Sequence, residues 1–243
     1  MYSAIALGVV CPMANERTTA INFIDDVLAQ CERFGFRSVH LFAVVDRVST
    51  DGTVELLKSA QSSRPALRVV WSPENRSVVD AYVRGYREAL ASGCDWILEM
   101  DAGYSHRPED IPQFFVKMAE GYDCVFGSRL MKLGSMKDNP LKRQLISRGG
   151  SMLSNLLLRT GISDMTSGFE LFSRSTLEQA LSRGLHSTGP FFQTELKAYC
   201  RRLNFAEVPI VYRGASHNIG AAALTDSLSG LWRLCRLKAR GKL

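Results

Sequence analysis

Short apolar runs alternate with helical segments through the first half of the chain, and this alternation limits the fold more than any other feature. Buried strands are predicted at residues 4–11, 38–45, 67–71 and 95–100, with helices between them at 18–34, 53–62 and 77–92. A helix between two strands returns the chain across the sheet, so such strands pair in parallel. The sequence therefore predicts an α/β fold with a mostly parallel central sheet flanked by helices.

The second half of the chain continues the pattern less regularly. Further strands are predicted at residues 124–127, 168–173 and 206–212, and further helices at 141–159, 176–182 and 192–203. Residues 129–140 form a loop rich in Gly, Lys and Met, which is typical of an active-site loop. No repeat and no linker interrupts residues 1–220, so we treat them as one domain.

The last segment, residues 221–243, has an amphipathic pattern of its own. Apolar residues recur at helical spacing, and basic residues gather toward the end. These residues are Leu224, Leu228, Leu231, Trp232 and Cys235, with Arg233, Arg236, Lys238, Arg240 and Lys242. Two interpretations stay open: a basic helix on a membrane surface, or a helix docked on the domain with a solvated basic tail.

Composition and charge exclude several classes of protein. Of the 243 residues, 46% are hydrophobic and 22% charged, which excludes a disordered or coiled-coil chain. The net charge of +6 favours anionic partners, such as nucleotides, phosphates, membrane surfaces or nucleic acid. The six cysteines form no CxxC pair, so neither a disulfide framework nor a zinc site is indicated.

The same sequence features predict the cellular location. Scattered cysteines favour a reducing cytoplasm, and no signal peptide is recognisable. No apolar stretch approaches the ~20 residues of a membrane span. We therefore expect a cytoplasmic protein whose contact with a membrane, at the cytoplasmic face, is peripheral or made through a membrane-embedded partner.

Chemistry-bearing residues gather in five motifs, and the first three directly follow predicted strands. The first three are Pro12-Met-Ala-Asn15-Glu16, Asp46-Arg-Val-Ser-Thr-Asp51-Gly52-Thr53 and Met100-Asp101-Ala102-Gly103-Tyr104-Ser105-His106. The other two are Gly127-Ser128-Arg129 and Arg143-Gln-Leu-Ile-Ser147-Arg148-Gly149, which leads to Asp164-Met-Thr-Ser-Gly168-Phe169. Open α/β sheets bind ligands at the carboxyl ends of their strands, so the motifs predict a site at that edge.

This series of motifs resembles the inverting glycosyltransferases of family 2, which have the GT-A (Rossmann-like) fold. Among them it is most similar to the dolichol- or polyprenol-phosphate mannose synthases. The resemblance covers residues 4–215 and includes Phe192-Gln193-x-Glu195 and Glu207-Val-Pro-Ile210. It implies an enzyme, a hexosyltransferase that takes a sugar from a nucleoside diphosphate.

The resemblance also implies roles for individual residues. Departure of a nucleoside diphosphate gathers negative charge that the site must stabilise, and carboxylates suit the base and ribose as hydrogen-bond acceptors. The catalytic group would be Asp101, Arg129, Arg143 and Ser147. The residues around the nucleotide-sugar would be Pro12, Asn15, Glu16, Asp46, Asp101, Ala102, Arg148 and Arg213.

Two positions depart from the family pattern. Gly103 stands where the family has a second metal-binding aspartate, so Asp101, with Ser105 or the donor phosphates, is left to hold Mg²⁺ or Mn²⁺ unless basic residues replace the ion. Arg47 and Val48 stand where the family has Asp-Gly after its first aspartate, which leaves open whether the base is guanine or uracil.

The acceptor decides whether a general base is needed. A lipid phosphate needs none, because a phosphate monoester is already ionised near neutral pH, whereas an alcohol needs one. Asp164 is the only motif carboxylate available for that role, and its alternative is a hydrogen-bonding role in the turn that follows it. His106 is interpreted as a residue that orders its loop rather than as a metal ligand.

We therefore expect transfer of a hexose with inversion, mannose from GDP-mannose, onto a polyprenyl or dolichyl phosphate. One alternative is a UDP-sugar-dependent transferase with a lipid-phosphate or a soluble hydroxyl acceptor. An alternative of another class is an inactive subunit that binds a nucleotide-sugar. No nucleic-acid partner is expected, because a nucleic-acid-binding protein would account for the charge but not for the ordered motifs.

Overall fold

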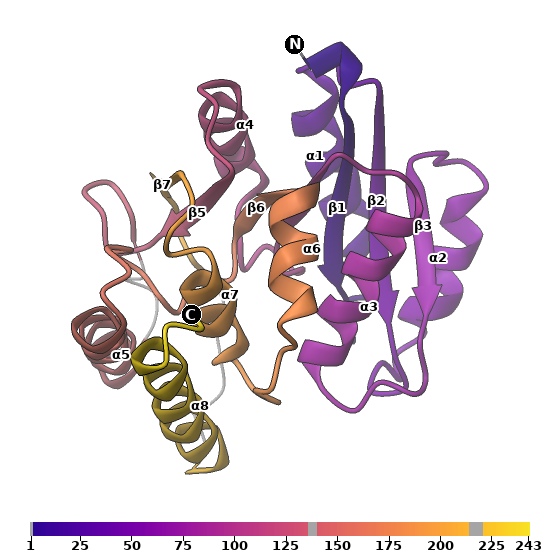
Figure 1. The fold of residues 1–243 in the computed structure, drawn as a ribbon. Helices are drawn as coiled ribbons and strands as arrows, with labels where there is room; N and C mark the ends of the chain where they lie inside the picture. The colour runs from indigo at the N-terminus through magenta and orange to yellow at the C-terminus, as the bar shows by residue number, and fades with distance from the viewer. Residues whose placement is uncertain (1, 136–139, 214–220) are drawn as a thin grey trace.

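The computed structural model describes residues 2–135, 140–213 and 221–243, which build a seven-stranded sheet between two layers of helices (Figure 1). The strands are β1 Ala6–Pro12, β2 Ser38–Val45, β3 Leu67–Trp71, β4 Trp96–Glu99, β5 Cys124–Ser128, β6 Glu170–Ser173 and β7 Phe205–Pro209. Their order in the sheet is β3-β2-β1-β4-β6-β5-β7.

Most neighbouring strands are parallel, as predicted. β3, β2, β1 and β4 form a parallel set, and β5 is parallel to β7. β6 runs antiparallel to both of its neighbours, β4 and β5. The direction of β6 was not predicted, because local periodicity identifies a strand but not the orientation of its partners.

Helices cover both faces of the sheet. On one face lie α1 Ala20–Glu32, α2 Thr53–Gln61 and α4 Ile111–Ala119, and on the other α3 Val78–Ala91, α6 Arg174–Ser182 and α7 Phe192–Tyr199. Alternate residues of β1 serve the two cores: Leu7 and Val9 pack with α1, and Val10 packs with α3. Two short 3₁₀ turns, Tyr2–Ala4 and Pro108–Asp110, complete these layers. α5 Leu141–Leu158 and α8 Ala221–Ala239 lie side by side near the β5–β7 end of the sheet (Figure 1).

Local signals explain where several elements begin. The hydroxyl of Ser77 accepts a hydrogen bond from the Asp80 backbone N, and the Asp80 carboxylate accepts one from the Ser77 backbone N, which is a capping box. α3 therefore begins at Val78, one residue inside the predicted helix. β2 and β3 occupy the predicted residues.

The predicted strand 206–212 is interrupted. β7 ends at Pro209, because its partner β5 ends at Ser128. Beyond that point Val211 forms an isolated bridge with Ser135, and Tyr212 forms one with the loop after β4, at residue 106. Tyr212 is thereby carried from the end of the sheet to the edge at which the sequence predicts the site.

Helix α8 is docked on the domain through its inner side. Leu231 and Leu234 are buried in the core that contains α7. Arg233 forms an ion pair with the buried Glu195 of α7, and Asp226 accepts a hydrogen bond from Ser187. The docked interpretation of the C-terminal helix therefore holds for this side of it.

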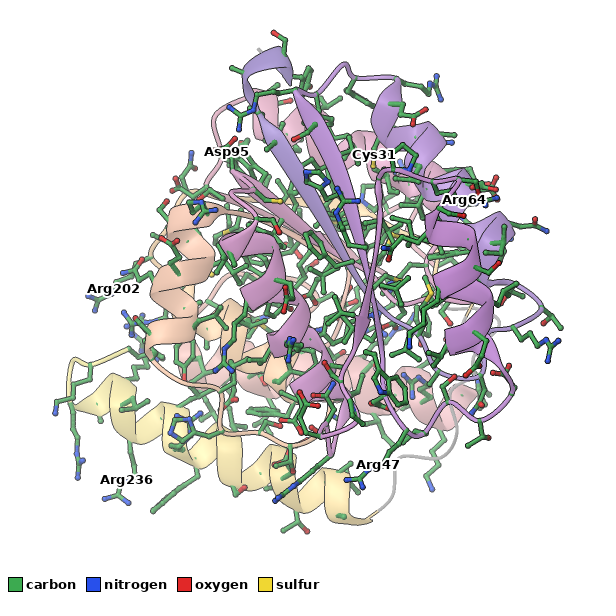
Figure 2. The ribbon with its side chains drawn as sticks, turned by 90° about the vertical axis from the view of Figure 1, so that its right-hand side faces the viewer. Cys31, Arg47, Arg64, Asp95, Arg202 and Arg236 are labelled. Atoms are coloured by element: carbon green, nitrogen blue, oxygen red, sulfur yellow. The ribbon has the colours of Figure 1, made fainter. Side chains whose placement is uncertain are left out.

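The opposite side of α8 stays exposed. Leu228 and Trp232 are each 63% exposed, and Leu224 is also exposed. The Arg236 guanidinium lies 4.4 Å from the centre of the Trp232 ring, and the side chain extends outward from the helix (Figure 2). Within the three described ranges, no helix is long and apolar enough to cross a membrane.

Candidate active site

Asn15 ties the loop after β1 to the loop after β2. Its φ of 58° is left-handed, a conformation that Asn adopts more easily than most residues. Its Nδ2 donates to the Val48 carbonyl, and its Oδ1 accepts from the Thr50 backbone N at 2.9 Å. In the second of these loops, Asp46 Oδ1 accepts a hydrogen bond from the Val48 backbone N. These two loops, predicted to surround the nucleotide, therefore form one connected edge.

Asp101 follows β4 and is held from two sides. The hydroxyl of Tyr82, on α3, donates to Asp101 Oδ1 at 2.6 Å. The Asp101 backbone N donates to Nδ1 of the buried His106 at 2.9 Å. Burial lowers the pKa of His106 to about 4, so its imidazole is neutral and carries its proton on Nε2. This contact supports the interpretation of His106 as a residue that orders its loop.

The carboxylate of Glu16 lies against the same loop. The Thr19 hydroxyl donates to Glu16 Oε2, and the Glu16 backbone N donates to Thr53 Oγ1. Gly103 has a φ of +65°, and a Cβ placed on it would lie 2.5 Å from Glu16 Oε1. The Glu16 carboxylate therefore occupies the space that a side chain at position 103 would need.

Arg129, expected to face a phosphate, forms an internal ion pair. Its Nε and Nη2 lie 2.7 and 2.8 Å from the two carboxylate oxygens of Asp164, and Nη2 also donates to Thr166. Both charged side chains are buried. Burial alone would raise the pKa of Asp164, but the charge and hydrogen bonds of Arg129 outweigh it and hold that pKa well below its usual range. Asp164 is therefore a poor general base, and its hydrogen-bonding role is the one that the structure supports.

Tyr212 lies between two arginines at the mouth of the site. Its ring centre is 5.7 Å from Cζ of Arg129 and 5.9 Å from Cζ of Arg143. Burial raises the pKa of its hydroxyl, and the charge of Asp101 raises it further. Nε of Arg143 is buried and has no hydrogen-bond partner among the residues described. This guanidinium therefore keeps an N–H group that can donate a hydrogen bond to an anionic ligand.

The remaining predicted residues divide between the site and the surface. On α5, Ser147 is buried and Arg143 is half-buried, whereas Arg148 is exposed on the outer side of the helix. The contact of Arg148 with a donor phosphate stays a prediction. Arg213 is exposed, and its backbone N donates to the Ser105 carbonyl at 2.9 Å. Pro12 ends β1, and Ala102 is buried beside Asp101.

Sequence reasoning missed a buried charged network below Asp101. Glu99 on β4 and Glu170 on β6 lie directly opposite each other, and both are fully buried. Nζ of Lys197 lies 2.7 Å from Glu170 Oε1, and Gln193 Nε2 donates to Glu99 Oε1 at 2.6 Å. Burial raises the pKa of Glu99 well above its usual range, and the neighbouring Glu170 charge adds to the effect.

That network fixes the strand that carries Asp101. The buried ion pair of Lys197 with Glu170 joins α7 to β6, and the hydrogen bond from Gln193 joins α7 to the end of β4. The available signal was a Glu inside the apolar run at 97–100, opposite a second Glu in another predicted strand. The pairing of those strands was needed to use it.

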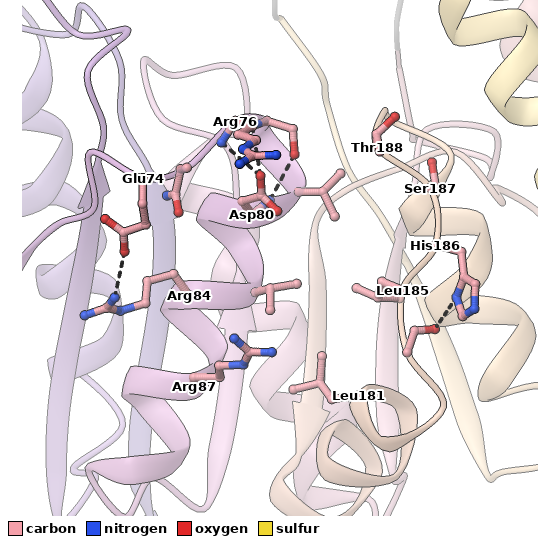
Figure 3. A pocket seen from close by; sticks show the side chains of 15 residues that line it. Glu74, Arg76, Asp80, Arg84, Arg87, Leu181, Leu185, His186, Ser187 and Thr188 are labelled. Carbon is pink, nitrogen blue, oxygen red and sulfur yellow. Dashed lines mark hydrogen bonds and ion pairs between the residues drawn. The ribbon is translucent and has the colours of Figure 1, made fainter.

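A separate pocket lies between α3 and the loop at 184–188 (Figure 3). Its volume is about 890 Å³, and its walls include Arg76, Arg87 and His186. Arg84 at the same wall is paired with Glu74 at 3.1 Å. The pocket contains none of the predicted site residues, so the motifs mark a different region from this pocket.

Comparisons with known proteins show the family and the fold. The sheet order and its flanking helices are those of glycosyltransferases of the GT-A class, and a strand-end aspartate and two arginines lie at the carboxyl edge. Residues 8–181 match the model of glycosyl transferase family 2, so the chain belongs to that family.

Two curated relatives cover most of the chain. An undecaprenyl-phosphate mannosyltransferase from Micrococcus luteus is 30% identical over 189 residues, which are 77% of this chain and 76% of the relative. A polyprenol monophosphomannose synthase from Mycolicibacterium smegmatis is 27% identical over 238 residues, 97% of this chain and 88% of the relative.

The fold is also that of solved glycosyltransferase structures. Glucosyl-3-phosphoglycerate synthase from Mycobacterium tuberculosis has a TM-score of 0.66 at 19% identity, over 96% of this chain and 81% of that one. Its complex with Mn²⁺, UDP and phosphoglyceric acid has a TM-score of 0.65 at 18% identity, over 95% and 78% of the two chains.

Proposed function

We propose that this glycosyltransferase moves a mannose, with inversion, from GDP-mannose to a polyprenyl phosphate at a membrane surface. The names of the two curated relatives, which describe mannosyl transfer to undecaprenyl phosphate and synthesis of polyprenol monophosphomannose, support the sugar and the acceptor class. The guanine base rests on the sequence resemblance, and a UDP-sugar is the alternative donor.

The single observation that carries the proposal is the two-sided helix α5. Its inner side presents Arg143 and Ser147 to the site, and its outer side presents Leu145 and Met152, which are 68% and 73% exposed. One helix thus has a free guanidinium donor on one side and an apolar surface on the other. A phosphate attached to a long lipid matches both sides at once.

Helix α8 extends this surface. Together the two adjacent helices form what we call the outer apolar face, made of Leu141, Leu145, Met152, Leu153, Leu156, Leu157, Leu224, Leu228 and Trp232. Exposed apolar areas of this kind mark contact sites, and Arg148 and Arg236 beside them complement anionic headgroups. The outer apolar face therefore supports peripheral contact with a bilayer, or with a membrane-embedded partner.

The site fits an acceptor that is already ionised. The phosphate of a lipid monoester attacks without a general base. Transfer to it therefore does not require Asp164, whose carboxylate is held in the ion pair with Arg129. Arg143 would donate to phosphate oxygens, and the ring of Tyr212 would hold the guanidinium in place. An alcohol acceptor would need a base, which this arrangement does not provide at Asp164.

A divalent cation fits the residues present if the donor supplies part of its shell. Among the described residues no three His, Cys, Asp or Glu side chains are grouped to hold an ion. The Tyr82 hydroxyl binds one carboxylate oxygen of Asp101, which leaves the second oxygen for an ion, and Mg²⁺ is commonly bound by one or two carboxylates plus substrate phosphates. Bound there, Mg²⁺ or Mn²⁺ would neutralise charge on the leaving diphosphate.

A transfer assay tests the proposal. Purified protein is incubated with labelled GDP-mannose, UDP-glucose or UDP-N-acetylglucosamine, with polyprenyl phosphate in vesicles or with a soluble alcohol, and lipid products are extracted. Mannosyl lipid from GDP-mannose alone is the expected result. Nucleotide binding without any transfer, under all of these conditions, would replace the proposal by the inactive-subunit alternative.

A further inference from the structure

Gly103 and Glu16 are matched to each other across two loops. The ideal Cβ position of Gly103 lies 2.5, 2.8 and 2.9 Å from Oε1, Oε2 and Cδ of Glu16, so the whole carboxylate group covers it. Non-bonded heavy atoms do not approach that closely, so any side chain at 103 would displace the Glu16 carboxylate. The Glu16 carboxylate can therefore hold its present position only because residue 103 has no side chain.

The Glu16 carboxylate also shares its surroundings with Asp101. Both carboxylates act on the buried Cys11 thiol, whose pKa is raised by burial first and then by the charges of Asp101 and Glu16. Each carboxylate spends one oxygen on a neighbouring hydroxyl, Asp101 on Tyr82 and Glu16 on Thr19. Among the residues that the structure describes, the second oxygen of each carboxylate makes no hydrogen bond.

We propose that Glu16 supplies the carboxylate that position 103 lacks, so that Glu16 and Asp101 together hold the divalent cation of the donor complex. This inference rests on the proposed function, which provides the nucleoside diphosphate that completes the shell. It assigns Glu16 to the cation, whereas the sequence motif placed it at the base or ribose. Two hard carboxylate ligands plus diphosphate oxygens form a donor set that Mg²⁺ and Mn²⁺ accept.

Coupling between cation and nucleotide distinguishes the two roles. GDP and UDP binding to the full chain is measured by titration calorimetry with Mn²⁺ and with EDTA, and Mn²⁺ binding is measured by electron paramagnetic resonance. In the wild type, Mn²⁺ should tighten binding of the preferred nucleotide by roughly 10- to 100-fold. Glu16→Gln should lose most of that gain while its affinity in EDTA stays within about twofold of wild type.

Two further variants separate the cation role from a change in folding. Asp26→Asn removes a carboxylate that accepts from Tyr104 of the same loop at 2.6 Å, without touching Gly103, and should keep the gain. Glu16→Ala combined with Gly103→Asp moves the carboxylate to the other loop, where Asp tolerates the left-handed backbone, and should restore part of it.

The possible outcomes lead to different conclusions. An equal gain from Mn²⁺ in the wild type and in Glu16→Gln would overturn the inference, and so would a loss of affinity in Glu16→Gln that is the same with Mn²⁺ and with EDTA. Wild-type protein that binds nucleotide equally well with and without Mn²⁺ would also overturn it, while the transferase stands. Wild-type protein that binds neither nucleotide would instead refute the proposed function.

Discussion

The outer apolar face should control binding to membranes, and the effect can be estimated from two side chains on α5. Fully burying a Leu or Met side chain stabilises by roughly 1.5–3 kcal/mol. Leu145 and Met152 are 68% and 73% exposed, so each has about 1.5 kcal/mol to gain from a bilayer. Replacing both by serine should weaken binding by about 3 kcal/mol, which is more than a hundredfold.

Flotation with vesicles of phosphatidylcholine and phosphatidylglycerol measures this change. The double variant should fold normally, because both side chains already face solvent in the free protein. Val116→Ser is the matched control: Val116 is 50% exposed, but it lies on α4, away from the outer apolar face, and its substitution should leave binding unchanged. Vesicle affinity of the double variant within twofold of wild type would refute the reasoning, since the face would then not be what enters the bilayer.

Three further predictions concern His106, Arg143 and Gly230. Folding lowers the pKa of His106 from 6.5 to about 4, so the unfolded chain binds the proton first as the pH falls. The free energy of unfolding should therefore decrease below pH 6.5, by about 2 kcal/mol from pH 7 to pH 5. His106→Asn should flatten that part of a plot of denaturant midpoint against pH, and an unchanged plot would contradict the assignment. Arg143→Ala should lower kcat/KM for transfer to the lipid phosphate by about 100-fold. Lys142→Ala is the control, because Lys142 is an exposed neighbour on the same helix, and its kcat/KM should stay near that of the wild type. Similar values for both variants would show that Arg143 is not part of the site. Gly230→Ala should destabilise the docking of α8 by about 1–3 kcal/mol, because the new Cβ would lie 2.5 Å from Cε1 of Phe191. This cost should exceed the gain in helix propensity. A raised melting temperature of the variant would contradict the prediction, because it would show that the Phe191 ring can move aside.

The element order was predictable because it depends on local pattern. β2 and β3 have the predicted bounds, and Asp101 directly follows the end of β4 as expected from an apolar run ending in a loop. The strand at 206–212 was overextended, since its true end depends on where β5 stops. Hydrophobic periodicity records burial along one segment and carries no information about the length of its partner.

The contents of the site were predictable only in part. The ion pair of Arg129 with Asp164 joins residues 35 positions apart, so no single motif could indicate it. Tyr212 belongs to no motif, and it reaches the site because the chain crosses from β7 to the loop after β4. Arg148 shares a motif with Ser147 but lies on the other side of α5, as its neighbouring position on a helix requires.

The sequence by itself determined the α/β architecture, the edge at which the motifs gather and the glycosyltransferase family, because strand ends and motif order are properties of single segments. Only the tertiary structure decided that α5 and α8, each with exposed apolar residues, lie side by side, and that Glu16 occupies the space beside Gly103. Those features depend on distances between segments far apart in the chain. Such distances are set by packing, which acts after each segment has adopted its local form.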